Sequence, residues 1–139
     1  MIKIFSSIIL LSMATNIHAQ NTVKEKAVKA YYRGFEKQDW NAVAAQLAEG
    51  FTFTSPNNDD HISIEVFKER CWPTSKFFKK VSFVNMLEKG DELMLLVEIT
   101  TTDGKIVRNI DLYNFTKEGK IKSIEVFFGA GSKYPGNKG

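Results

Sequence analysis

The sequence predicts an α+β domain, with helices and one short strand in its first half and a four-stranded antiparallel meander in its second. Apolar side chains recur at helical spacing through most of residues 23–72, whereas residues 81–128 hold four runs rich in Val, Ile, Phe and Leu. Turns marked by Gly90, Gly104 and Gly119 separate these runs. With 139 residues, of which 43% are hydrophobic and 25% charged, the chain has enough residues for one globular core.

The N-terminus has the pattern of a secretory signal peptide at residues 1–19. Lys3 supplies a positive start, residues 4–13 are largely apolar, and Ala19 is the small residue that signal peptidase needs. The apolar run is too short to span a membrane. We therefore expect a secreted or periplasmic protein that starts near Gln20, with no membrane insertion after cleavage. Residues 20–130 then form the single domain, and residues 131–139, rich in Gly, Lys and Pro, form a flexible tail.

The first helix is predicted at residues 23–38, where Gly34 permits close packing against the sheet. Its apolar side recurs at helical spacing: Val28, Tyr31, Tyr32 and Phe35. Asp39 can cap a second helix, which Gly50 ends. A short strand at residues 51–54 follows.

A turn-rich loop at residues 55–60 should lead from this strand to the third helix. Ser63 is a suitable N-cap for that helix, and it should end near Trp72 because Pro73 disfavours helix before it.

The Asp-Gly pair at residues 103–104 favours a two-residue hairpin turn, which would pair Thr102 with Lys105. Counting back from that turn, Glu98 faces Asn109. Side chains alternate across a strand, so this register decides which residues share a face.

The segment at residues 116–120 suits a three-residue loop with Gly119 in the left-handed conformation, which would place Asp111 opposite Glu125. The two registers together predict an aliphatic face made of Leu95, Val97, Ile99, Ile110, Leu112, Ile124 and Val126. They predict a second, mixed face made of Met94, Leu96, Glu98, Val107, Asn109, Asp111, Tyr113, Glu125 and Phe127. Acids within an apolar frame indicate a pocket floor, although a solvent-facing surface would also explain the acids.

If the mixed face lines a pocket, the aliphatic face has no helix to cover it. Large apolar patches usually mark interfaces, and a two-fold axis is the commonest solution. We therefore expect a homodimer through this convex sheet face.

The chain resembles the SnoaL-like members of the nuclear transport factor 2-like superfamily. The resemblance rests on Asp-Trp-Asn-Ala-Val at residues 39–43, Phe-Thr-Phe-Thr-Ser-Pro at residues 51–56, and residues 119–129, and it extends over residues 23–129. It implies a cystatin-like α+β barrel, in which a curved antiparallel sheet wraps over three N-terminal helices as a cone with an internal pocket. Relatives include ketosteroid isomerase, polyketide cyclases, limonene epoxide hydrolase and scytalone dehydratase. Their shared acid–base chemistry uses pocket Asp, His and Tyr side chains, but this chain matches none of their individual catalytic patterns.

Glu98, Asp111 and Glu125 are the first catalytic candidates. Opposed carboxylates in a pocket repel one another, which raises the pKa of one toward the range of a general acid or base. Alternatively, Arg33 or Arg70 neutralises them, or they meet water.

Asp60 and His61 form a second candidate pair near the mouth of the cone, where Asp60 would orient His61 as a general base. Asx turns and helix capping need the same residue types, so this pair also has a purely structural explanation. The predicted ligand pocket comprises Tyr31, Tyr32, Arg70, Trp72, Asn109, Tyr113 and Phe127, although such aromatics are also common in a plain core.

Two functions remain open: a small-molecule enzyme of isomerase, dehydratase or hydrolase type, or a non-catalytic module of the cell envelope that binds a ligand or protein. The sequence shows no nucleophile motif or phosphate loop, and we expect no cofactor. Cys71 is the only cysteine and His61 the only histidine after the signal peptide, which excludes zinc sites built from several such ligands. A lone Cys71 is more often a small buried hydrophobe than a reactive thiol. The net charge of +3 gives no reason to expect nucleic-acid binding.

Overall fold

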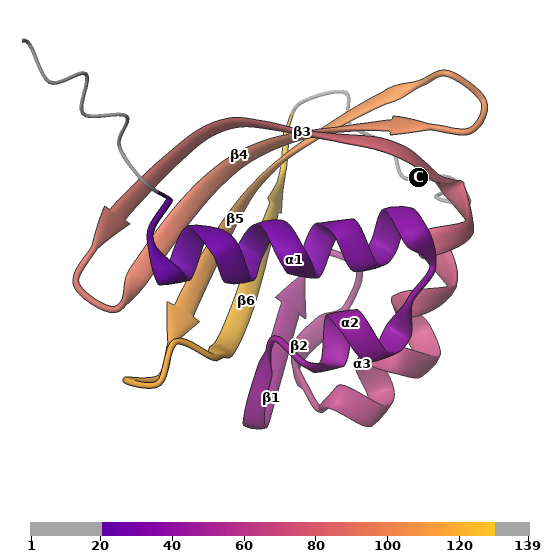
Figure 1. Ribbon diagram of the computed structural model, residues 1–139. Coiled ribbons are helices and arrows are strands. Elements are labelled where there is room, and N and C mark those ends of the chain that lie inside the picture. The colour runs from indigo at the N-terminus through magenta and orange to yellow at the C-terminus, as the bar shows by residue number, and fades with distance from the viewer. Residues whose placement is uncertain (1–20, 130–139) are drawn as a thin grey trace, which may run out of the picture.

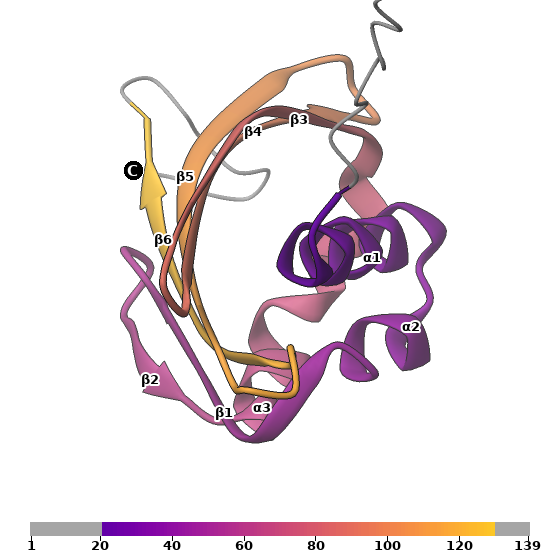
Figure 2. The same cartoon turned by 60° about the vertical axis from the view of Figure 1, so that its left-hand side comes forward.

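The computed structural model describes residues 21–129 and confirms an α+β fold in which a curved, unclosed sheet wraps around helices. The helices lie on the concave side of the sheet, and α1 runs across it (Figures 1 and 2). The predicted signal peptide at residues 1–19 and the predicted tail at residues 131–139 lie outside the described residues.

Helix α1 (Val23–Lys37) forms close to its predicted bounds. The Thr22 side chain caps its start by accepting a hydrogen bond from the Glu25 N–H. Its buried face is the apolar side seen in the sequence: Ala27, Val28, Tyr31, Tyr32, Gly34 and Phe35. The tyrosines therefore point toward the sheet.

Gly34 serves a contact other than the predicted one. A Cβ atom at this position would lie 2.5 Å from Val43 Cγ2 on helix α2 (Trp40–Ala44). The close approach is therefore between two helices, not between α1 and the sheet.

The next elements are more extended than predicted. Helix α2 ends at Ala44, and β1 (Leu47–Ser55) then pairs in parallel with the last strand, while β2 (Asp59–Ile62) pairs with β1 where a loop was expected. Pairing with distant strands outweighs the local helix and turn preferences here.

Helix α3 (Ile64–Arg70) begins after the Ser63 cap, as predicted. It is followed by a 3₁₀ helix, η1 (Trp72–Phe77), which has Pro73 at its start. These segments close the concave side near β1 and β2 (Figure 2).

The four-stranded meander is confirmed as β3 (Phe78–Lys89), β4 (Glu92–Thr101), β5 (Ile106–Phe115) and β6 (Ile121–Phe128). The strand order of the whole sheet is β2-β1-β6-β5-β4-β3. All neighbouring pairs are antiparallel except β1 with β6. In this order β6 and β5 are the two central strands. Their concave face is turned toward the helices, and a pocket can form between the two layers (Figure 2).

The predicted register between β4 and β5 is wrong by one residue. The Thr101 N–H donates to the Lys105 carbonyl at 2.8 Å, and Gly104 has φ +83°. This is a three-residue loop with a left-handed glycine instead of a two-residue turn. Glu98 consequently faces Arg108 instead of Asn109.

The predicted loop between β5 and β6 is correct, but the register beyond it is not. The Thr116 N–H donates to the Lys120 carbonyl at 2.9 Å, and Gly119 has φ +81°. An irregularity in the strand pairing after this loop then shifts the pairing by one residue. Asp111 therefore faces Val126, not Glu125.

The two shifts change which side chains of β5 share a face with those of β4 and β6. A one-residue slip moves every side chain of a strand to the other face relative to its neighbours. The concave face combines residues predicted to be apart: Leu95, Val97, Asn109, Asp111, Tyr113, Ile124 and Val126, all buried. The predicted aliphatic and mixed faces are therefore wrong as sets.

Candidate functional site

A cavity of about 420 Å³ lies between the concave face of the sheet and the helices. Aromatic and aliphatic side chains form about half of its wall, and the rest consists of polar groups from β5, the β1–β2 region, α3 and η1. The lining residues are Tyr31, Tyr32, Phe35, Phe53, Ser55, Asn57, Asp59, Phe67, Arg70, Cys71, Thr74, Phe78, Asn109, Asp111, Ile124, Val126 and Phe128. A cavity of this size that combines aromatic walls with convergent polar groups is typical of small-molecule sites.

Asp111 is the more deeply buried of the two acids in this cavity, with only 1% of its surface exposed. Tyr32 and Tyr113 both donate hydrogen bonds from their hydroxyls to Oδ2, the latter at 3.1 Å. The other oxygen, Oδ1, is buried and has no hydrogen-bond partner among residues 21–129. Burial raises the pKa of Asp111 to about 6, although both tyrosine hydrogen bonds lower it. The carboxyl can therefore exchange a proton close to neutral pH.

The two tyrosines reach Asp111 for different local reasons. Tyr113 lies two residues further along β5 and so shares its face, while Tyr32 lies on the buried side of α1. Burial raises the pKa of Tyr113 well above its usual value, and the Asp111 charge adds to this effect. Tyr113 thus remains a protonated donor that fixes one oxygen of the acid.

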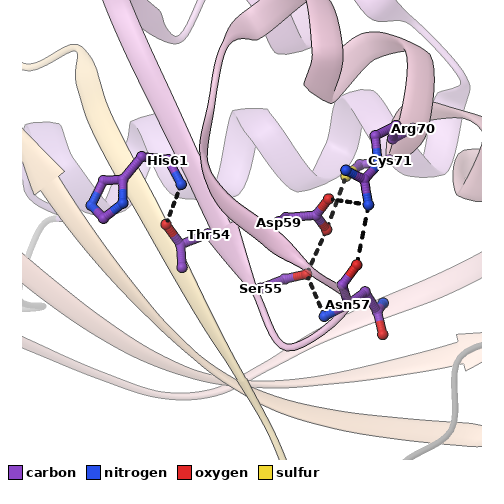
Figure 3. A network of polar contacts seen from close by, with 7 residues as sticks. All are labelled: Thr54, Ser55, Asn57, Asp59, His61, Arg70 and Cys71. Carbon is purple, nitrogen blue, oxygen red and sulfur yellow. Dashed lines mark hydrogen bonds and ion pairs between the residues drawn. The ribbon is translucent and has the colours of Figure 1, made fainter.

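A second polar group, shown in Figure 3, involves Asp59, Arg70, Ser55 and Asn57. Arg70 Nη2 lies 2.9 Å from Asp59 Oδ1 and also donates to the Asn57 carbonyl at 3.1 Å. Ser55 Oγ donates to Asp59 Oδ2 at 2.7 Å. The Asp59 side chain is 5% exposed and that of Arg70 44%, so the ion pair connects the cavity wall with solvent. Arg70 neutralises Asp59 at this end.

The two polar groups occupy separate parts of the same sheet. Three strand spacings of about 4.8 Å separate β5 from β2, or about 14 Å along the curved sheet. The strand pairing gives the residues between the two acids. Asp111 pairs with Val126, and Ser55 pairs with Asp59. Val126 lies beside Ser55, because the preceding residues Glu125 and Thr54 pair with each other. The cavity therefore has an inner acid and an outer ion pair, with Val126 and Ser55 between them on the sheet.

Cys71 is half-buried in the cavity wall, with Sγ 4.0 Å from Asp59 Oδ2. Burial raises the pKa of the thiol to about 12, with the Asp59 charge as the second cause. Because the thiolate is the reactive form, Cys71 serves as an apolar part of the wall.

The predicted carboxylate cluster does not form, because of the register shifts described above. Glu98 and Glu125 point to the outer face of the sheet, opposite to Asp111. Arg108 Nε lies 2.8 Å from Glu98 Oε1 on that face. Phe127 also points outward and is 49% exposed. Only Asp111 of the three acids reaches the cavity.

Asp60 and His61 are also outside the cavity. Their side chains are exposed and in contact, with 2.5 Å between Asp60 Oδ1 and His61 Nδ1. The His61 backbone N–H donates to Thr54 Oγ1, and Figure 3 shows the His61 and Thr54 side chains on the other side of the ribbon from Asp59 and Arg70. The pair therefore cannot orient a base toward a ligand in this cavity.

Trp72 was predicted to line the pocket, but it is not among the lining residues. It is half-buried and packs against Phe35 and Trp40, with ring centroids 5.0 Å and 5.4 Å apart. Its role in this structure is to pack η1 against the helices.

The family model of the SnoaL-like domain matches residues 28–124. The chain belongs to the SnoaL-like domain family.

Within the part that the structure describes, no three His, Cys, Asp or Glu side chains are grouped to hold a metal ion. No helix in residues 21–129 is long and apolar enough to cross a membrane.

Solved structures place this SnoaL-like domain in the NTF2-like superfamily. An NTF2-like protein of unknown function from Cytophaga hutchinsonii is 25% identical, with a TM-score of 0.59 over 81% of this chain and 95% of the other. A cystatin-like protein of unknown function from Methylobium petroleophilum is 15% identical, with a TM-score of 0.67 over 84% and 81%. A provisionally assigned ketosteroid isomerase from Kribbella flavida is 15% identical, with a TM-score of 0.64 over 84% of each chain. No curated protein sequence matches the chain significantly.

The structure of the SnoaL-like domain places five predicted site residues in the cavity wall: Tyr31, Tyr32, Arg70, Asn109 and Asp111. Tyr113 lies behind the wall and contacts Asp111. The sequence prediction missed Ser55, Asn57 and Asp59. The alternation of Phe51, Phe53 and Ser55 along β1 was the available signal for Ser55, whereas Asp59 required knowledge that β2 exists.

Proposed function

We propose that this SnoaL-like domain binds a small, largely apolar molecule in the cavity and that Asp111 exchanges a proton with it. One observation carries the proposal: a buried carboxyl in a cavity with aromatic walls has one oxygen held by two tyrosines and the other without a protein partner among residues 21–129. A pKa of about 6 suits a general acid or base near neutral pH. The fold shared with a provisionally assigned ketosteroid isomerase supports isomerase-type chemistry.

The arrangement favours a reaction in which one group takes up and returns a proton. The second acid in the wall, Asp59, is held by Arg70 and Ser55. Asp111 thus has no second free acid beside it among the described lining residues, and a proton shift within one substrate needs only one. The non-catalytic alternative, a ligand- or protein-binding module of the cell envelope, uses the same cavity without this step.

Binding is tested with 1-indanone, a compact apolar ketone, by NMR titration of the labelled protein. Val126→Phe places a ring in the cavity wall and should abolish binding, whereas Glu125→Phe places it on the opposite face of the same strand and should not. If 1-indanone causes the same chemical-shift changes in Val126→Phe as in the wild type, binding at this site is refuted.

Chemistry is tested by deuterium uptake at the α-carbon of 1-indanone in D₂O. The wild type should accelerate uptake with saturation in ketone concentration, and Asp111→Asn should remove most of that acceleration. If the two proteins bind the ketone alike and neither exchanges it faster than buffer alone, the non-catalytic alternative is correct. Equal acceleration by both proteins would refute proton exchange by Asp111.

Export is a further part of the proposal, supported by the charge and apolar pattern of residues 1–19. Secretion or transfer to the periplasm should remove these residues. The intact mass of the protein from its native source decides the matter, because a mass that includes Met1 contradicts cleavage.

We also propose a homodimer through the outer face of the sheet, on a corrected set of residues. Leu95, Val97, Ile124 and Val126, predicted for this interface, belong to the core instead. Two neighbouring rows of paired residues nevertheless make an apolar outer patch: Leu87, Met94 and Leu112, with Leu96, Ile110 and Phe127. Four of the six are exposed by between 42% and 63%, which is unusual for a monomer surface.

Sedimentation tests this dimer. Ile110→Lys places a charge within the outer patch and should give a folded monomer, whereas Ile106→Lys at the end of the same strand should leave the dimer intact. A wild-type monomer at high micromolar concentration contradicts the dimer and leaves the cavity proposal unaffected.

A further inference from the structure

The inner end of the cavity carries an unbalanced negative charge when Asp111 is ionised. The lining residues include three charged side chains: Asp59, Arg70 and Asp111. Arg70 is 2.9 Å from Asp59 and bonded to the Asn57 carbonyl, at the outer end. Within residues 21–129, Asp111 has no ion-pair partner of its own, and its polar contacts are the hydroxyls of Tyr32 and Tyr113. A buried carboxylate without a counter-charge is strongly disfavoured. A ligand that places a cation at Oδ1 would therefore stabilise the ionised form of Asp111 more than a neutral ligand would.

Aromatic rings adjoin this acid. Four rings that line the cavity form one connected cluster: Tyr31, Tyr32, Phe35 and Phe78. The ring centroids are 5.3 Å apart for Tyr31 and Tyr32 and 5.1 Å apart for Phe35 and Phe78. The hydroxyl of Tyr32 joins this cluster directly to Asp111. Aromatic faces attract cations through their quadrupole, most strongly where water is excluded. The site therefore offers a cation both a counter-ion and a π surface.

We infer that the ligand of this cavity is a primary or secondary amine with a compact apolar body, bound as an ammonium ion that donates to Asp111 Oδ1. This inference rests on the proposed ligand-binding function and specifies its ligand class. Both tyrosine hydroxyls donate to Oδ2, which leaves Oδ1 as the acceptor for the ammonium N–H groups. The apolar body would extend along the aromatic wall toward Arg70, where the neutralised ion pair adds no net charge.

The protonation state of Asp111 decides between this ligand and its alternative. A neutral Asp111 would carry its proton on Oδ1 and would donate to a carbonyl, whereas an ionised Asp111 selects a donor. The titratable groups that face Asp111 are Tyr32 from α1 and Tyr113 from its own strand, with Tyr31 next to them, and none of the three is a carboxyl, an imidazole or an amine. The pH dependence of binding between about pH 5 and about pH 8 should therefore report Asp111.

The test compares three molecules with one skeleton: 1-aminoindane, 1-indanol and 1-indanone. At about pH 7.5 the amine should bind the wild type at least about tenfold more tightly than the alcohol, since a charge-assisted hydrogen bond is stronger than a neutral one. At about pH 5 the affinity for the amine should fall about tenfold, in proportion to the ionised fraction of Asp111, while that for the alcohol changes little. Asp111→Asn should bind the amine no more tightly than the alcohol. The control Glu125→Gln, which removes a carboxyl from the outer face, should behave as wild type.

A second readout comes from NMR titration of the carboxyl carbons. Linkage requires the amine to lower the pKa of Asp111, because it binds the ionised form. If the ketone or alcohol binds as tightly as the amine at about pH 7.5, or if amine binding survives in Asp111→Asn, the amine inference is wrong, but the cavity proposal stands. If none of the three probes binds the folded wild type, both proposals fail.

Discussion

Replacement of Asp111 by asparagine should change how stability depends on pH. The pKa of this carboxyl is about 6 in the folded protein and 3.8 in the reference state, so the folded protein binds the proton more tightly between these values. The free energy of unfolding of the wild type must therefore fall as pH rises through this window. At about 1.4 kcal/mol per pH unit, the rise from 3.8 to about 6 corresponds to a loss of about 3 kcal/mol.

The asparagine side chain of this variant is not ionisable, so the variant lacks this loss while its amide carbonyl can still accept hydrogen bonds from Tyr32 and Tyr113. The difference in unfolding free energy between variant and wild type should therefore increase, in favour of the variant, by about 3 kcal/mol from about pH 3.5 to about pH 7. A constant offset, such as an unsatisfied amide N–H, costs about 1–3 kcal/mol but does not alter this slope.

Urea unfolding followed by circular dichroism at several pH values measures the difference, since a domain of this size is expected to unfold in one step. Glu125→Gln is the matched control, because it removes an exposed outer-face carboxyl from the neighbouring strand. The difference in unfolding free energy between Glu125→Gln and the wild type should not show the increase with pH that is expected for Asp111→Asn. A flat difference for Asp111→Asn across the whole range would show that Asp111 is not a buried acid with a raised pKa.

Two further predictions concern packing and reactivity. Gly34→Ala places a methyl group 2.5 Å from Val43 Cγ2 and should destabilise the protein by about 1–3 kcal/mol in urea unfolding, a loss that adding Val43→Ala should partly relieve; an unchanged midpoint would contradict the close α1–α2 contact. Cys71 has a pKa raised from 9.0 to about 12, so a thiol reagent at about pH 8 should label the native protein about a thousandfold more slowly than the urea-unfolded chain. Native labelling within about tenfold of the unfolded rate would place the thiol in water.

The sequence by itself determined the elements that depend on local pattern. The apolar spacing of Tyr31 and Tyr32, the Ser63 cap and the four β runs all predicted what the structure shows. These features depend on side-chain periodicity and capping, which act within a few residues. The expectation of a pocket floored by the sheet followed from the same pattern and from the family resemblance.

Only the tertiary structure decided which side chains share the pocket. A left-handed Gly104 in place of a tight turn, and an irregularity after Gly119, each shifted one strand register by a single residue. Because side chains alternate across a strand, these two shifts separated Glu98 and Glu125, on the outer face, from Asp111, which alone of the three acids lies inside. Likewise, the short strand that carries Asp59 forms only by pairing with β1, which no local pattern encodes. The chemistry of the site thus depends on pairing between strands, whereas the elements themselves depend on local sequence.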